Sequence, residues 1–196
     1  MAKTPSPRPP LGWNSWDCYG TTVTEAEVLA NAEHMAQHLL PFGWDTVVVD
    51  IDWSDPTARS HGYNEGAPLH LDALGRLMPD PERFPSSAGG VGFGPLADKI
   101  HGLGLKFGIH VMRGIPRRAT AERLPVAGAG AGRGDAAAGV PAGTRDRSSA
   151  GFESAPVTAD QIADETNRCE WNPHMDGLRH DHPGAQAYYD SVVALY

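Results

Sequence analysis

The sequence predicts an α/β fold with a parallel sheet, and two observations support this prediction. Over residues 11–112, candidate strands and helices alternate in the order strand, helix, strand, helix, strand. This order is typical of right-handed βαβ units, in which each helix crosses over so that the next strand runs parallel to the last. The middle strand candidate, residues 44–53 (WDTVVVDIDW), is a nearly continuous β-branched run, as expected for a parallel strand covered on both faces.

The first two elements have clear boundaries. Residues 11–16 (LGWNSW) are short and aromatic and lie between Pro10 and Gly20, which predicts a strand that leads into a turn. Thr24 and Glu27 have the spacing of a capping box. A helix is expected after them because apolar residues recur at helical spacing until Pro41 and Gly43, namely Val28, Ala32, Met35, Ala36 and Leu39.

The remaining elements follow a long irregular stretch. Residues 54–94 are interrupted by many prolines and glycines and predict a functional loop. Residues 95–104 predict a helix that begins at proline and ends at glycine, and residues 105–112 predict the third strand. Near the end of the sequence, Tyr188, Val192 and Leu195 share one face of a helix predicted over residues 184–196.

Two segments are expected to be disordered. The first is residues 1–8, a polar, proline-rich leader, and the second lies inside residues 116–164, a stretch without apolar periodicity. Within that second segment, residues 127–156 are a low-complexity insertion dominated by alanine and glycine. Such residues bury too little apolar area to offset the entropy lost on ordering, so this insertion is expected to interrupt the fold without joining it.

Composition excludes several classes of function. The chain has 196 residues, enough for a single domain, with 16 basic and 24 acidic side chains and a formal charge of -8. No cluster of Lys and Arg suggests a nucleic-acid partner. No run of about 18 apolar residues predicts a membrane span, and the leader lacks the apolar stretch of a secretory signal, so a cytoplasmic location is expected. Two cysteines far apart give no disulfide framework.

Candidate functional residues gather at the predicted strand ends. Asp50 and Asp52 are two apart on one predicted strand, so both side chains are expected on the same face at its carboxyl end. His110 and Arg113 end the third strand and are expected to point into the same mouth. A purely structural role remains an alternative, in which Lys, Arg or backbone donors in the loop satisfy the two acids. No metal site is assigned, because His180 and His182 are better explained as surface histidines.

The tryptophans offer flat apolar faces that suit the C–H faces of a sugar. Trp13 and Trp53 lie near strand ends and are candidates for this role, with core packing as the alternative. Trp16 and Trp44 are interpreted as core residues.

Five segments together resemble family 27 glycoside hydrolases, the α-galactosidase or melibiase enzymes: residues 11–16, 49–53, 105–110, 171–177 and 182–190. The resemblance implies a partial (β/α)8 TIM barrel, with about the first three βα units in an incomplete domain over residues 9–196. It also implies a retaining hydrolase for terminal α-linked galactose or a related sugar, with no cofactor and a small carbohydrate as partner. The substrate-binding residues it implies, together with those at the strand ends, are Trp13, Asp50, Asp52, Trp53, His110 and Arg113.

The chain departs from the family pattern at three points. Typical members have consecutive acids where this chain has Asp50 and Ile51, and a tyrosine where it has His110. Substrate preference is therefore expected to differ. The Lys-x-Asp motif that carries the family's nucleophile occurs nowhere in the sequence, so both catalytic carboxylates are expected beyond Tyr196 and the chain is expected to be inactive alone.

Three strands of a barrel would leave open sheet edges, which predicts self-association. Two alternatives remain open for the function. One is a non-catalytic carbohydrate-binding remnant. The other is an unrelated βαβ domain that binds a metal or phosphate at Asp50 and Asp52.

Overall fold

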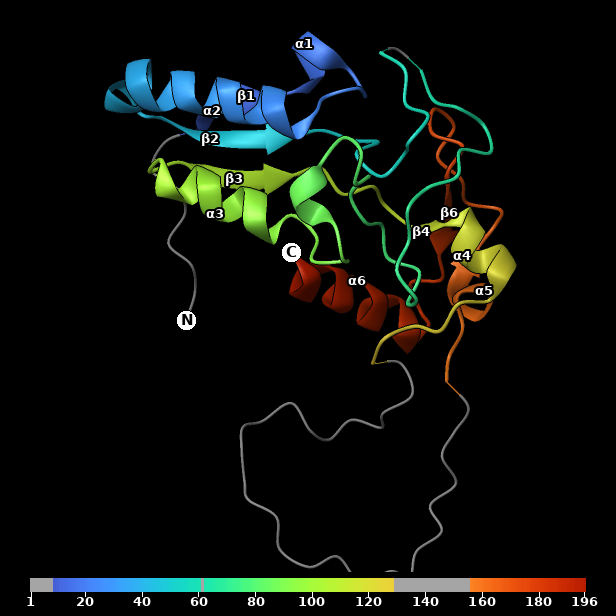
Figure 1. The fold of residues 1–196 in the computed structure, drawn as a ribbon. Helices are drawn as coiled ribbons and strands as arrows, with labels where there is room; N and C mark the ends of the chain where they lie inside the picture. Colours follow the sequence, from blue (N-terminus) through green and yellow to red (C-terminus); the bar gives the residue numbers. More distant parts are fainter. Residues whose placement is uncertain (1–8, 61, 129–155) are drawn as a thin grey trace, which may run out of the picture.

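A computed structural model describes residues 9–60, 62–128 and 156–196, and it has the predicted α/β architecture with a parallel sheet (Figure 1). The expected leader, residues 1–8, lies outside the described residues. So does nearly all of the expected insertion at 127–156. The backbone amide of Val126 donates to the carbonyl of Val157 at 2.8 Å, so the two flanks of that insertion lie side by side.

The first sheet confirms the predicted strand order. Strands β1 (Leu11–Asn14), β2 (Trp44–Val49) and β3 (Lys106–Ile109) are parallel and adjacent in that order. A short helix, α1 (Trp16–Tyr19), follows β1. Gly12 allows β1 to approach β2 closely, because a Cβ atom at this position would overlap the carbonyl of Thr46. Beyond the strand ends lie the loops and the second half of the described chain (Figure 1).

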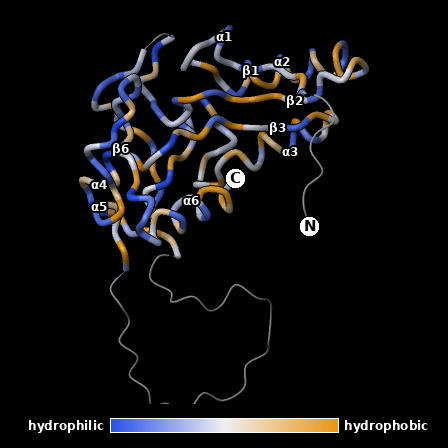
Figure 2. Tube along the Cα trace, turned by 180° about the vertical axis from the view of Figure 1, so that it is seen from behind, coloured by the Kyte–Doolittle hydropathy of each residue, from blue (hydrophilic) through white to orange (hydrophobic). Residues whose placement is uncertain are grey.

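Two helices cover the sheet as predicted. Helix α2 (Glu25–His38) begins with the expected capping box: the Thr24 hydroxyl accepts from the Glu27 amide, and the Glu27 carboxylate accepts from the Thr24 amide. Helix α3 (Gly94–Gly102) has Pro95 in its first turn, and the 3-10 helix η1 (Leu40–Phe42) follows α2. The apolar faces of α2 and α3 pack against the sheet in the main core. This core includes Val28, Ala32, Met35, Val47, Val49, Phe84, Leu96 and Ile100. Apolar residues predominate along β2 in Figure 2.

The strand predicted over residues 44–53 is shorter in the structure. Strand β2 ends at Val49, and Asp52 has a φ of 62°, in the left-handed region that non-glycine residues rarely adopt. The reason is local: the Ile51 amide donates to the Asp50 carboxylate at 2.8 Å, while the Asp50 amide donates to the Ser15 hydroxyl at 2.9 Å. Side chains thus replace the strand ladder as partners, and the chain turns.

The described residues of the predicted loop at 54–94 are largely irregular and include a 3-10 turn, η2 (Pro85–Ser87), and a bridge between Leu71 and Leu77. The guanidinium of Arg83 fixes its position against the neighbouring loops. It donates five hydrogen bonds to backbone carbonyls, which belong to Thr21, Val23, Asp52 and Asp55. Burial lowers the pKa of Arg83, and the carboxylates of Asp80, Asp55 and Asp52 oppose that effect.

The sequence did not predict the second sheet. Strands β4 (Ile115–Pro116), β6 (Met175–Leu178) and β5 (Ala163–Asp164) are antiparallel in the order β4-β6-β5. Helices α4 (Arg117–Glu122), α5 (Ala159–Ile162) and the correctly predicted α6 (Pro183–Leu195) surround it. Ile115, Ile162 and Tyr188 belong to the second core here. Within the described ranges, no helix has the length and apolar character needed to cross a membrane.

Candidate functional site

The carboxylate of Asp50 lies where the three parallel strands end, and each strand end contributes to its surroundings. Its Oδ1 accepts from the Ile51 amide at 2.8 Å and from Nδ1 of His110 at 3.1 Å. Its Oδ2 accepts from the side-chain amide (Nδ2) of Asn14 at 2.8 Å. A carboxylate oxygen can accept about two hydrogen bonds, so Oδ2 retains a free lone pair for a ligand hydroxyl.

These hydrogen bonds determine the charge of Asp50. Burial alone would raise its pKa, but the bonds from His110, the Ile51 amide and Asn14 together outweigh burial and lower the pKa to about 2. Asp50 is therefore ionised at neutral pH. Because an ionised carboxylate only accepts hydrogen bonds, Nδ1 of His110 is the donor in its bond to Asp50.

The backbone around this pair is fixed from behind. The backbone amide of Ser15 donates to the Val48 carbonyl, and the buried Ser15 hydroxyl accepts from the Asp50 backbone amide. The indole of Trp53 donates to the His110 carbonyl at 3.0 Å. Trp53 itself is only 2% exposed and packs in the main core, so its prediction as a sugar-stacking residue is corrected: it supports His110 from the core side.

An open cavity of about 440 Å³ lies over Asp50. Aromatic and polar side chains line it, namely Asn14, Trp16, Asp17, Asp50, Ile51, Tyr63, His110 and Trp171. Trp16 is 39% exposed, so its interpretation as a core residue is wrong. Its position follows from Asn14, whose Oδ1 accepts from the Trp16 amide at 2.8 Å. One asparagine side chain thus positions both an aromatic ring and the carboxylate.

Trp13 does not line this cavity. Its ring packs partly against the main core and meets Tyr19 edge to face at 6.1 Å between centroids. Successive residues of a strand point to opposite faces, so Trp13 and the cavity-lining Asn14 lie on different sides of β1. Trp16, three residues later, lines the cavity instead.

Asp52 is also separate from the cavity, which corrects the prediction that it shares a face with Asp50. The left-handed turn directs it into the interior, where its side chain is 5% exposed and Oδ1 lies 3.4 Å from Nδ1 of His174. Nε2 of His174 lies 2.8 Å from the Asn64 carbonyl. Both ring nitrogens face acceptors, and only the protonated ring can donate to both of them. Burial opposes this charge, but Asp52 and the Asn64 carbonyl together raise the pKa of His174.

Arg113 lies outside the cavity as well. Its guanidinium is exposed and donates to the Asn167 side chain and the Arg168 carbonyl, both at 3.1 Å. It thus ties the end of β3 to the segment before β6. Among the candidate site residues, only Asp50 and His110 are brought together at the cavity.

Comparison with known proteins identifies relatives of the chain in sequence and in fold. No family model matches the sequence. A GH27 β-L-arabinopyranosidase from Geobacillus stearothermophilus, with arabinose bound, is 50% identical at a TM-score of 0.81; the match covers 96% of this chain and 38% of that one. A putative α-N-acetylgalactosaminidase from Bacillus halodurans is 48% identical at a TM-score of 0.79, with the same coverages. The chain is related to glycoside hydrolase family 27.

Curated family 27-like relatives agree with the structural ones. The probable α-galactosidase B of Neosartorya fischeri is 33% identical over 108 residues, or 55% of this chain, and so is the α-galactosidase mel1 of Schizosaccharomyces pombe. The chain spans about a fifth (21%) of the length of these two curated relatives. Its relatives are thus glycoside hydrolases, and the metal or phosphate alternative is not favoured. In the described part, no group of three or more His, Cys, Asp or Glu side chains is placed to hold a metal.

Sequence reasoning missed several residues that line the cavity over Asp50. Trp16, Tyr63 and Trp171 line the cavity from three separate segments, and the ring of His174 packs against that of Tyr63. The signal for Trp16 is its place after a strand that ends in asparagine. Tyr63 and Trp171 lie in loops far apart in the sequence, and no local pattern brings them together.

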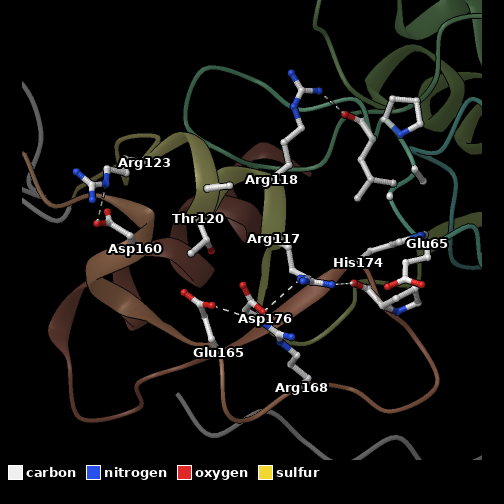
Figure 3. Close-up of a pocket in the computed structure, with 16 residues that line it drawn as sticks. Glu65, Arg117, Arg118, Thr120, Arg123, Asp160, Glu165, Arg168, His174 and Asp176 are labelled. Atoms are coloured by element: carbon white, nitrogen blue, oxygen red, sulfur yellow. Dashed lines mark hydrogen bonds and ion pairs between the residues drawn. The ribbon is translucent and has the colours of Figure 1, made fainter.

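A second and larger cavity of about 950 Å³ lies between α4, α5, β6 and the loop at residues 65–69 (Figure 3). Its charged side chains pair with one another. Arg168 and Arg117 converge on the buried carboxylate of Asp176 at 3.0 and 3.7 Å, and Arg123 pairs with Asp160 at 3.4 Å. Because a buried carboxylate is costly unless it is paired, this network is explained by the needs of Asp176.

Proposed function

We propose that this chain forms the sugar-holding part of the active site of an α-galactosidase-like retaining glycoside hydrolase, which acts on a terminal galactose or a closely related pyranose. One observation carries the proposal: an ionised Asp50 with a free lone pair faces an open cavity beside Trp16 and His110. A carboxylate accepts strongly from sugar hydroxyls, and an indole face suits the C–H face of a pyranose. The relatives at 48–50% identity support this assignment.

Two finer features belong to the same proposal. The three βα units are the first units of a (β/α)8 barrel, and residues 127–156 are an insertion in it. The parallel order of β1, β2 and β3 and the TM-score of 0.81 over 96% of the chain support the barrel, and the paired flanks at Val126 and Val157 support the insertion. Among the described residues, β1 and β3 each pair with another strand on one side only, and such open edges are expected to promote self-association. Size-exclusion chromatography with light scattering tests this prediction.

Sugar binding is tested by titrating the chain with D-galactose and L-arabinose in a calorimeter. Asp50→Asn is expected to lower the affinity for the preferred sugar about tenfold or more, because a bond to a charged acceptor is worth about 1.5–3 kcal/mol. Asp45→Asn is the matched control: Asp45 lies at the other end of β2 and pairs with Lys106 at 2.6 Å. Equal affinities for the wild type and Asp50→Asn would refute the proposal.

The preference between the two sugars depends on Ile51. The resemblance implies an acid here, whereas Ile51 is an apolar, buried lining residue that accepts no hydrogen bond. A sugar hydroxyl left without a partner costs about 1–3 kcal/mol. L-Arabinopyranose is galactopyranose without its hydroxymethyl group, so it has one fewer hydroxyl to satisfy. The pocket therefore favours the pentopyranose.

A substitution tests this preference. Ile51→Asp is expected to shift the ratio of affinities toward D-galactose by about fivefold or more, since it restores an acceptor. An unchanged ratio would show that another residue sets the preference.

Catalysis requires groups other than Asp50 and Asp52. A retaining glycosidase needs a nucleophile and an acid/base about 5 to 5.5 Å apart at different atoms of the glycoside. Asp50 is an ionised acceptor, and Asp52 is buried against His174. The chain is therefore expected not to hydrolyse a 4-nitrophenyl α-galactoside. Turnover that disappears in Asp50→Asn would show that Asp50 is a catalytic residue.

A further inference from the structure

We infer that Trp171 and Tyr63 form a platform for the leaving group of the glycoside, which would present a flat aromatic or C–H face. The inference rests on the proposed sugar site, because the platform lines the same cavity as Asp50, His110 and Trp16. It assigns to these two side chains a role in substrate specificity.

The first observation is the exposure of Trp171. It is 55% exposed, although neighbouring Asn172 is 1% exposed and His174 is 7% exposed. An exposed indole directly before this buried stretch is not explained by core packing. Its ring contacts that of Tyr63, with centroids 5.6 Å apart and planes tilted by 48°. Together the two rings present an apolar surface beside a polar sugar site.

The second observation is that this surface is held in place from beneath. The Tyr63 ring meets His174 edge to face, at 6.2 Å and 90°. His174 in turn bonds the Asn64 carbonyl and pairs with buried Asp52, so the backbone next to Tyr63 is fixed by a charged pair. On the other side, the Asn172 side chain accepts from the His174 amide at 2.9 Å, which fixes the backbone next to Trp171.

The third observation is the division of polar groups. Asp50, Asn14 and His110 lie together at one part of the cavity, and the stacking face of Trp16 accompanies them. Trp171 comes from the loop that precedes β6 and Tyr63 comes from the loop at residues 62–66, and neither ring adds a charge. A pyranose ring is satisfied by the polar groups. The apolar pair is then available to the group attached at its anomeric oxygen.

Binding of three ligands tests the inference: methyl α-galactoside, 4-nitrophenyl α-galactoside, and melibiose, whose leaving group is a second sugar. The corresponding L-arabinopyranosides are used if the pentopyranose is preferred. Stacking on an aromatic ring is worth about 0.5–1.5 kcal/mol, so the wild type is expected to bind the aryl glycoside about 3- to 10-fold more tightly than the methyl glycoside. Melibiose exceeds the methyl glycoside in affinity if a sugar face is also accepted.

Trp171→Ala is expected to bring the ratio of aryl to methyl affinity close to one. Tyr63→Phe keeps the ring and is expected to keep the ratio. Trp44→Ala is the matched control, because Trp44 is 39% exposed but lies at the other end of β2. Circular dichroism spectra that match the wild type establish that each variant is folded.

The outcomes separate this inference from the proposed function. If Trp171→Ala leaves the ratio unchanged while Asp50→Asn weakens every glycoside, the platform is refuted and the sugar site stands. If Asp50→Asn changes no affinity, the proposed sugar site is refuted. If no glycoside binds the wild type, both are overturned.

Discussion

Replacement of Asp50 by asparagine tests whether the charge at the centre of the site is fixed by its hydrogen bonds. The pKa of Asp50 is lowered from its ordinary value of 3.8 to about 2, by His110, the Ile51 amide and Asn14 acting against burial. In free energy this corresponds to about 2.4 kcal/mol. The carboxylate borders an open cavity, and solvent screening reduces the expected contribution to about 1–2 kcal/mol.

The sign of the pH dependence follows from the direction of the shift. Because the folded-state pKa is lowered, the stabilisation is fully present above about pH 4 and is lost as the pH falls through about 2. Asp50→Asn lacks the charge at every pH. The difference in unfolding free energy between the wild type and this variant is therefore expected to be about 1–2 kcal/mol at neutral pH, and about half of that at pH 3.

Two measurements check this expectation. Urea unfolding of both proteins, followed by circular dichroism between pH 3 and pH 7, gives the difference in stability. An NMR titration of the Asp50 carboxyl carbon gives its pKa directly. A pKa near 3.8, or a stability difference that does not change with pH, would refute the argument that the three donors fix this charge.

Three further predictions concern the scaffold. Arg83→Met removes the five hydrogen bonds to backbone carbonyls and is expected to lower the free energy of unfolding in urea by about 3–5 kcal/mol. Arg83→Lys is expected to recover only part of this stability. A cost below about 1 kcal/mol for Arg83→Met would contradict the role assigned to Arg83. The raised pKa of His174 means that its contribution to stability is present below about pH 6.5 and is lost at higher pH. The difference in unfolding free energy between the wild type and His174→Gln should therefore shrink from pH 6 to pH 9. A difference that grows with pH would contradict the raised pKa. Thr24→Ala breaks the capping box and is expected to cost about 1 kcal/mol in the same assay, whereas Thr24→Ser keeps a capping hydroxyl and is expected to change little.

Local signals made the first half of the fold predictable. The capping box at Thr24 and the proline at the start of α3 each depend on residues within one helical turn, and both helices form where expected. The β-branched run of β2 needs no distant partner to be recognised. The second sheet could not be predicted in this way, because β4 and β5 have two residues each and pair with β6 across the chain. No periodicity fits into two residues.

The site was predictable only where strand geometry alone determines it. Asp50 and His110 end adjacent parallel strands and therefore meet. Asp52 was misplaced because the period of two along a strand holds only while the strand lasts, and β2 ends at Val49 when side chains take over its hydrogen bonds. Trp171 and Tyr63 meet through loops whose positions depend on the buried pair of His174 and Asp52.

Sugar binding and bond cleavage make opposite demands on a carboxylate, and Asp50 meets only the first. A general acid must hold a proton near neutral pH, which requires a raised pKa, whereas the donors around Asp50 lower its pKa to about 2. A nucleophile must keep a lone pair directed at the anomeric carbon, whereas Oδ1 of Asp50 is occupied by the Ile51 amide and His110, and the free lone pair of Oδ2 is the acceptor proposed for a sugar hydroxyl. The same bonds keep the carboxylate charged and correctly oriented for a hydroxyl at every pH above about 3. Binding geometry is thus built within the ends of β1, β2 and β3, and the chemistry must come from carboxylates in different surroundings.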